Sequence, residues 1–237
     1  MSSTVDLPPE AMHNVGYSFA EMSSTDWSEK TANLIRQYRG EETLEKRLPE
    51  PHGTLLEVSP DFGKMTDEYL LGAVMARPGL SMRERSIIIM AALLANRYEL
   101  VAPGHMRWTL NIGVSREEVI EIILQVAPIA GWPVGNEIFS LIERAYPGYQ
   151  QTVKDNPFSD VWSQPGLSLR ERTMVTMAAF VARRFNDRLK AHIRHALNIG
   201  LSREEILELI MQVTPFSGWA IGTEAIRAAG DVFSAKE

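Results

Sequence analysis

The chain has 237 residues, enough for one large domain or for two of ordinary size. Apolar residues make up 45% and charged residues 23%, close to the average of soluble globular proteins, so a sizeable core can form. The formal net charge of −6 argues against a nucleic-acid partner, which would require a basic face.

No stretch approaches the roughly 20 successive apolar residues that a membrane span needs. The N-terminal segment also lacks the basic and apolar regions of a secretion signal. We therefore expect a soluble, cytoplasmic protein without membrane contact. Cysteine is absent, which excludes disulfides, thiolate metal sites and cysteine catalysis within these residues.

The first 70 residues differ in pattern from the rest of the chain. Segments 26–38 and 41–48 predict helices, and the stretch LPEPHGTLLEVSP that follows is typical of a loop. We predict an N-terminal helical extension over residues 1–70.

A long internal repeat follows the extension. PGLSMRERSIIIMAALLANR, from Pro78, recurs as PGLSLRERTMVTMAAFVARR, from Pro165, and the segment that begins at His105 recurs at His192. Both pairs lie 87 residues apart, and about half of the aligned positions are identical. Two copies of this length are too few for a solenoid, so they indicate a duplicated subdomain. The expected units are a first repeat over 71–146, a connector over 147–164 and a second repeat over 165–237.

The first helix of each repeat is predicted from its N-terminal cap. Ser81-x-x-Glu84 and Ser168-x-x-Glu171 are capping boxes, in which the serine caps the helix and the glutamate reaches back. The residues after each box are mostly apolar, so we expect both helices to be buried on most sides.

The second helix contains residues 105–110, with Pro103 suited to its first turn and Gly113 to its C-terminal end. Its counterpart is expected over 187–198, ending at Gly200. A third helix opens with another capping box in each copy and has a broad apolar face.

Proline and glycine pairs follow the third helix. Pro128 with Gly131, and Pro215 with Gly218, are expected to break that helix before a final one begins. No segment alternates as a strand with hairpin turns would. The prediction is an all-α fold of two duplicated helical subdomains with pseudo-two-fold packing.

These motifs resemble the carboxymuconolactone decarboxylase family across most of the chain. YLLGAVMARPGLSMRERS is similar to the family segment that ends in Arg-Pro-Gly-Leu. ELVAPGHMRWTLNIGVSREEV is similar to its Glu-Leu…His-x-Arg…Asn-x-Gly…Glu-Glu, and APIAGWPVGNEIF to its closing Gly-x-Pro. In the second copy Gln164 replaces the arginine and Ala220 the proline.

The same superfamily includes AhpD-like alkyl hydroperoxidases, which use a Cys-x-x-Cys pair just before this histidine. The matching positions are Tyr98 and Val101 in the first copy, and Phe185 and Arg188 in the second. Because the thiols are absent, thiol peroxidase chemistry is excluded.

The resemblance implies a lyase that works without a cofactor, by acid/base chemistry, on a lactone or a carboxylated aromatic or polyketide intermediate. Two alternatives stay open. One is an isomerase, cyclase or rearrangement enzyme of natural-product biosynthesis that uses the same pocket without loss of carbon dioxide. The other is a non-catalytic binding or assembly protein. Single-copy relatives associate into rings, so a homotrimer of this tandem chain is expected.

Decarboxylation without a cofactor requires a cation to orient the substrate, an acidic group to stabilise the electron-rich intermediate, and a returning proton. His105, the histidine of the family motif, is the expected acid or base, because its proton moves near neutral pH. A histidine satisfied in the core is the alternative. Arg77 is the expected anchor for a carboxylate or lactone, because a guanidinium can donate two parallel hydrogen bonds.

Arg85 and Glu137 are expected to support these two residues. Arg85 lies at a helix start, where a cation needs an anionic partner, either Glu84 or a substrate. Glu137 follows a Gly-Trp-x-x-Gly turn, where it either caps the final helix or donates a proton into a pocket.

Bulky side chains near the motifs are expected to contact the substrate. Trp108 and Trp132 add bulk rather than charge, and Ile129 stands where the family often has tyrosine. This favours a substrate larger and more hydrophobic than a doubly charged muconolactone.

Three further residues are expected at substrate sites. Arg107 either clamps a carboxylate or forms a salt bridge between the repeats, and His192 and Trp219 are the second-copy counterparts of residues already named. His192 and His195 are three apart, but no third ligand stands at a suitable spacing, so no metal site is expected.

Overall fold

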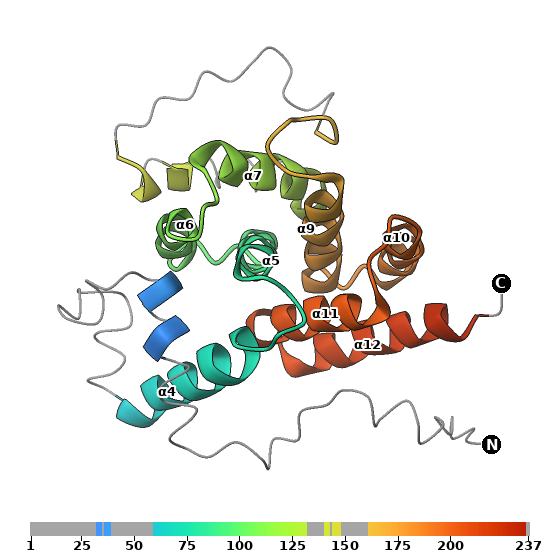
Figure 1. Cartoon of the computed structure of the whole chain (residues 1–237), viewed down its shortest axis with the longest axis horizontal. Coiled ribbons are helices and arrows are strands. Elements are labelled where there is room, and N and C mark those ends of the chain that lie inside the picture. The colour runs from blue at the N-terminus through green and yellow to red at the C-terminus, as the bar shows by residue number, and fades with distance from the viewer. Residues whose placement is uncertain are drawn as a thin grey trace.

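The computed structural model describes residues 32–34, 36–38, 59–131, 140–142, 144–147 and 161–235, and every regular element in these ranges is helical (Figure 1). The helices before the connector are α4 (Pro60–Met65), the π-helix η3 (Thr66–Met75), α5 (Met82–Ala95), α6 (Ala102–Leu110) and α7 (Arg116–Ala130). Those after it are α9 (Leu169–Ala182), α10 (Asn186–Asn198), α11 (Arg203–Ser217) and α12 (Trp219–Ser234).

The duplication is visible in the packing. Helices α5, α6 and α7 recur as α9, α10 and α11, and the two first helices, α5 and α9, lie against each other at the centre (Figure 1). The third helix of each repeat packs on both central helices, so α7 contacts α9 and α11 contacts α5. The two repeats therefore share one core, and the prediction of an all-α duplicated fold with pseudo-two-fold packing is confirmed.

The four predicted capping boxes are present. In each, the serine hydroxyl accepts from the backbone N–H of the glutamate three residues on, and the glutamate carboxylate accepts from the serine N–H. Two of the backbone donors that a helix start leaves unpaired are satisfied in this way. Local sequence therefore fixes where the first and third helices of each repeat begin.

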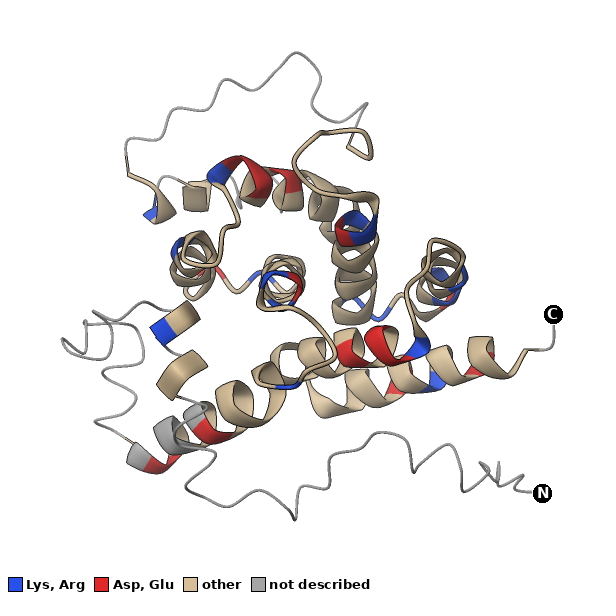
Figure 2. Ribbon diagram, viewed as in Figure 1, with Lys and Arg blue, Asp and Glu red and all other residues tan. Residues whose placement is uncertain are grey.

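The central helices are buried nearly all round. Every residue from 87 to 95 in α5 has at most 1% of its surface exposed, and α9 is buried from Arg172 to Ala182. Pairs of alanines lie in the middle of both helices, where small side chains allow close helix packing. Figure 2 shows the charged residues of α9 gathered at one end, with the rest of that helix uncharged.

The expectation that Pro128 and Pro215 break the third helices is wrong. Pro128 lies within α7, which continues to Ala130, and Pro215 lies within α11, which continues to Ser217. Each proline stands in the last turn, where it removes a single N–H donor. The helices end instead at glycines, both with a φ of +104°, a backbone conformation that disfavours other residues.

The helix over Pro60–Met75 is not among the predicted elements. Its second half is a π-helix, whose wider turns do not follow the 3.6-residue period used to predict helices. Residues 71–75 are buried against the core.

Several predicted segments lie wholly or partly outside the described residues. The described part of segment 26–38 is helical, as predicted. The predicted helix over 41–48, the loop that follows it up to residue 58, and residues 148–160 of the connector lie outside. None of the described helices is both long and apolar enough to cross a membrane.

Candidate active site

A cavity of about 620 Å³ lies where the two repeats meet the N-terminal segment. Its walls come from η3, the end of α5, the loop 97–101, α6 and Tyr38 on one side, and from Pro215 and Phe216 of α11 on the other. Because α11 belongs to the second repeat, the cavity of the first repeat is completed by the second. Most of the lining side chains are apolar or aromatic.

His105 lines this cavity from the first turns of α6, and only 9% of it is exposed. Its Nδ1 atom lies 2.9 Å from the hydroxyl oxygen of Tyr38. Its ring packs edge-on against Trp108, with 4.7 Å between ring centroids, and lies 6.1 Å from Phe216. Three aromatic side chains from three parts of the chain therefore hold the imidazole.

Tyr38 is a site residue that the sequence analysis missed. It is 1% exposed, lines the cavity, and packs against the edge of Trp108. The side-chain amide of Asn111, at the end of α6, donates to the Tyr38 carbonyl over 2.9 Å. Tyr38 and His105 are 67 residues apart, and no local pattern indicates a contact at that separation.

Two charged residues, Arg97 and Glu99, line the cavity from the loop after α5. Arg97 has a φ of +61°, in the left-handed region, which turns the chain out of α5. Its counterpart Arg184 has a φ of +59° and forms an ion pair with Glu224. Both repeats therefore share the left-handed backbone at this position. Arg97 lines the cavity, whereas Arg184 pairs with Glu224.

Tyr98 and Val101 also line the cavity. These are the positions that the resemblance noted above matches to the cysteine pair of the AhpD-like peroxidases. The same region of the helical unit thus faces a cavity in this chain, with a phenol and an isopropyl group in place of thiols.

Arg77 and Arg85 do not line the cavity, and both bind Glu208 of α11. The Arg77 guanidinium donates to both Glu208 oxygens, from Nε over 2.8 and 3.0 Å, and Arg85 donates over 3.0 Å. Although burial opposes ionisation, these hydrogen bonds hold the pKa of Glu208 below its usual range. Arg85 is fully buried and also binds Gln212 and the Arg77 carbonyl. These contacts favour a structural role for both arginines, at the interface between the repeats.

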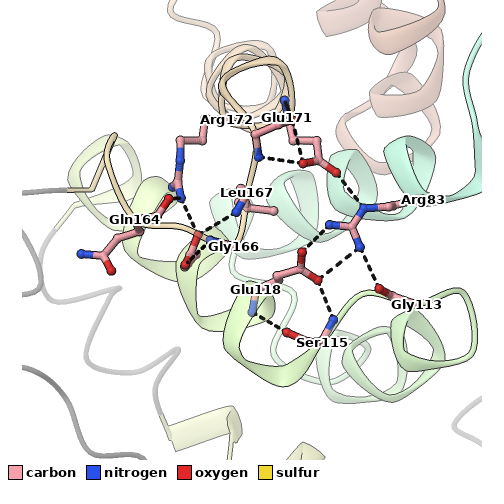
Figure 3. A network of polar contacts seen from close by, with 11 residues as sticks. Arg83, Gly113, Ser115, Glu118, Gln164, Gly166, Leu167, Glu171 and Arg172 are labelled. Atoms are coloured by element: carbon pink, nitrogen blue, oxygen red, sulfur yellow. Dashed lines mark hydrogen bonds and ion pairs between the residues drawn. The ribbon is translucent and has the colours of Figure 1, made fainter.

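An equivalent cluster exists on the other side of the pseudo-two-fold axis (Figure 3). There Arg172 binds Glu121, which also accepts from the backbone N–H groups of Gly166 and Leu167 over 3.0 Å each. A Cβ on Gly166 would lie 2.8 Å from a Glu121 oxygen, so only glycine permits this approach.

Capping glutamates also join the repeats. Arg83 binds Glu171 of the other repeat over 2.7 Å, as Figure 3 shows, and Arg170 binds Glu84 over 2.8 Å. Burial alone would raise the pKa of Glu84, but hydrogen bonds from Arg170 and Ser81 lower it. Each of these glutamates therefore caps its own helix and holds the partner repeat.

His192, on α10, lies in different surroundings from His105. It packs edge-on against Phe180, with 4.8 Å between ring centroids, and its Nδ1 lies 3.1 Å from the Arg188 carbonyl. Burial lowers the pKa of His192 below its ordinary value, and the nearby His195 adds to this. His192 is not part of the cavity wall around His105.

The remaining expected substrate-binding residues are scattered. Trp108 lines the cavity, and Ile129 is half-buried on α7 away from the cavity wall. Arg107 is exposed and donates to the Arg144 carbonyl over 3.3 Å. Trp219 is 68% exposed at the start of α12.

Glu137 and Trp132, the other two expected site residues, lie outside the described residues. In the part of the chain that the structure describes, no three His, Asp or Glu side chains gather as metal ligands would.

Comparison with known proteins assigns the family. The sequence profile of the carboxymuconolactone decarboxylase family matches twice, over residues 60–144 and 147–231. Over 85 residues, 36% of its length, the chain is 32% identical to 4-carboxymuconolactone decarboxylase of Acinetobacter baylyi. Over 70 residues, 30% of its length, it is 30% identical to nitrosuccinic acid decarboxylase npaB of Metarhizium robertsii. These matches span 63% and 49% of the two relatives. The chain belongs to the carboxymuconolactone decarboxylase family and carries two copies of its helical unit in one polypeptide.

Proposed function

We propose that this protein is a decarboxylase-type lyase that needs no cofactor and acts on a lactone or a carboxylated aromatic or polyketide intermediate. The observation that carries the proposal is the position of His105, buried in the wall of a cavity large enough for such a molecule. Both matched relatives are named as decarboxylases, which supports the reaction class.

In the reaction, the substrate loses carbon dioxide and gains a proton at the same carbon. The bond between the carboxylate and the ring carbon breaks, and its electron pair passes into the conjugated carbonyl or lactone. Carbon dioxide leaves, and His105 returns a proton to the carbon. Among the cavity-lining side chains, imidazole has the ordinary pKa nearest to neutrality, which suits it to this transfer.

The lining of the cavity indicates the kind of substrate. Leu70, Leu71 and Met75 of η3, with Phe216 and Trp108, line it and offer an apolar surface. An apolar wall favours a ring system over a small, doubly charged acid.

Arg97 is the cation we assign to substrate binding, because it lines the cavity and a guanidinium pairs well with a carboxylate. Arg77, the anchor expected from the sequence, binds Glu208 instead. We therefore propose a substrate with one carboxylate, held near Arg97, and an apolar ring near His105.

The test is carbon dioxide release from a panel of unsaturated lactones and carboxylated aromatic acids, with product analysis by mass spectrometry. Loss of 44 mass units together with carbon dioxide supports the lyase. Conversion at constant mass supports the isomerase, cyclase or rearrangement reaction instead. Absence of conversion, despite binding detected by calorimetry, supports a non-catalytic binding protein.

The oligomeric state and the repeat boundaries stay predictions. A homotrimer is expected because single-copy relatives associate into rings. Light scattering would measure the mass in solution, and a clean monomer would contradict the expectation.

A further inference from the structure

The contact between Tyr38 and His105 joins two segments that the family match does not connect. Tyr38 lies in the N-terminal segment, outside both matched regions, whereas His105 lies within the first. The phenol oxygen is 2.9 Å from Nδ1, and both side chains are buried. A hydrogen bond at this depth is screened little by water, so it strongly constrains the imidazole.

We propose that Tyr38 is a positioning residue that donates its hydroxyl proton to Nδ1 of His105 and thereby keeps the imidazole proton on Nε2. This inference rests on the proposed function of His105. A phenol is a stronger acid than the N–H of neutral imidazole, so the O–H···N arrangement is favoured over the reverse. Nε2 then carries the ring proton, and it is this nitrogen that can act as the acid toward a substrate.

The place of His105 in α6 supports a neutral ring. It lies in the first turns of the helix, where the positive end of the helix dipole disfavours imidazolium. A neutral histidine whose proton is fixed on one nitrogen presents that proton at a defined position. In a mixture of tautomers, only a fraction of the molecules has the proton on the nitrogen that donates it.

The proton balance of the step follows from this arrangement. As Nε2 gives its proton to the substrate carbon, Nδ1 takes the proton of the Tyr38 hydroxyl. The imidazole therefore stays neutral during the transfer. After the product leaves, Nε2 takes a proton from water and Nδ1 returns its proton to the Tyr38 phenolate, which restores the starting state.

Further contacts of Tyr38 make it a rigid donor. The Asn111 amide holds its carbonyl over 2.9 Å, and the Trp108 ring lies 5.7 Å from its own ring. In the second repeat, the Nδ1 atom of His192 faces a main-chain carbonyl, that of Arg188, rather than a phenol. A carbonyl can only accept, so the two histidines are expected to hold opposite tautomers when neutral.

The test is the tautomeric state of His105, measured by NMR on full-length protein labelled with ¹⁵N-histidine, with signals assigned by loss in the His105→Gln variant. The expected spectrum shows Nε2 protonated and Nδ1 unprotonated at neutral pH. In Tyr38→Phe, the Nδ1 signal should shift toward the average of the two tautomers.

Tyr146→Phe is the matched control. Tyr146 is also buried against α6, and its hydroxyl donates to the Met106 carbonyl over 2.7 Å, so its removal costs one comparable hydrogen bond. This variant should leave the His105 signals unchanged. Equal shifts in both variants would mean that loss of packing, rather than of the phenol proton, moves the signals, and would overturn the proposal.

A protonated Nδ1 in the unaltered protein would also overturn it, and this measurement does not depend on whether Tyr38→Phe folds. Because the spectra need no substrate, the outcome is separate from the proposed reaction. A fixed tautomer without carbon dioxide release from any substrate would contradict the lyase and leave the positioning role standing. Where a substrate is found, Tyr38→Phe should lower kcat about tenfold or more with little change in KM. The reason is that a catalytic histidine held in the wrong tautomer can lose up to about 10⁴-fold in kcat.

Discussion

The two repeats place the same motif histidine in two different surroundings. In the first repeat, α6 is buried on several sides, by the core and by the segment that carries Tyr38. In the second, α10 buries one stripe only, formed by Leu189, Ile193 and Ala196. His105 consequently lies in the wall of a cavity, whereas His192 packs on Phe180 beside a main-chain carbonyl.

Part of this difference arises from elements that lie before the recurring helices α5, α6 and α7 in the first copy. Thr66, Leu70, Leu71 and Met75 of η3, together with Tyr38 of the N-terminal segment, supply part of the cavity wall. The second repeat contributes Pro215 and Phe216 to that same cavity. A duplicated unit can thus supply a site in one copy and a wall for that site in the other.

The largest expected effect separates the two histidines. His105→Gln should lower kcat by about 10²–10⁴-fold, because it removes the group that exchanges the proton. His192→Gln should change it by less than about twofold, since that ring lies outside the cavity wall. Steady-state rates on any substrate found in the panel provide the measurement. Equal losses in both variants would contradict a single site in the first repeat.

The next effect concerns stability at the interface between the repeats. Glu208→Gln leaves Arg77 and buried Arg85 without their carboxylate and should cost about 3–5 kcal/mol, the usual loss when one partner of a buried pair is removed. Urea unfolding at neutral pH would measure it. Glu224→Gln, which breaks the exposed pair with Arg184, is the control and should cost much less, because solvent screens an exposed pair.

Glu208→Gln should also change how the free energy of unfolding depends on pH. The pKa of Glu208 is lowered in the folded protein, so its contribution to stability is present above the ordinary pKa of glutamate, about 4.3. That contribution is lost as the pH falls through the folded value. Glu208→Gln should therefore make the free energy of unfolding less dependent on pH below this range.

A smaller effect on KM should distinguish Arg97 from Arg184, the two arginines with a left-handed backbone. Arg97→Gln should raise KM about tenfold, the equivalent of one charge-assisted hydrogen bond to the substrate. Arg184→Gln, at the matching position of the second repeat, should leave KM unchanged. An unchanged KM in Arg97→Gln would move the carboxylate site elsewhere in the cavity.

The smallest effect is the pH dependence that His192 contributes. Because burial lowers its pKa, the unfolded chain binds a proton more readily than the folded one. Stability is therefore complete above the ordinary histidine pKa of about 6.5 and falls as the pH drops below it. Replacement of His192 by Gln should flatten the stability profile as the pH falls below about 6.5, as followed by thermal unfolding.

The sequence by itself determined the repeat, the helical fold class and the family. The duplication is readable because identical spacing persists over more than one segment, and the capping boxes are readable because each involves residues only three apart. Short-range hydrogen bonds of this kind depend on the local chain alone. His105 could be named in advance because it belongs to a motif.

Only the tertiary structure decided which residues accompany His105. Tyr38 is 67 residues away, and Phe216 comes from the other repeat, so their contacts depend on how the helices pack. From the sequence, Arg77 was expected to anchor a substrate carboxylate or lactone. The approach of α11, which brings Glu208 to its guanidinium, favoured the ion pair. A side chain's chemistry is fixed by its type, but its partner is fixed by the fold.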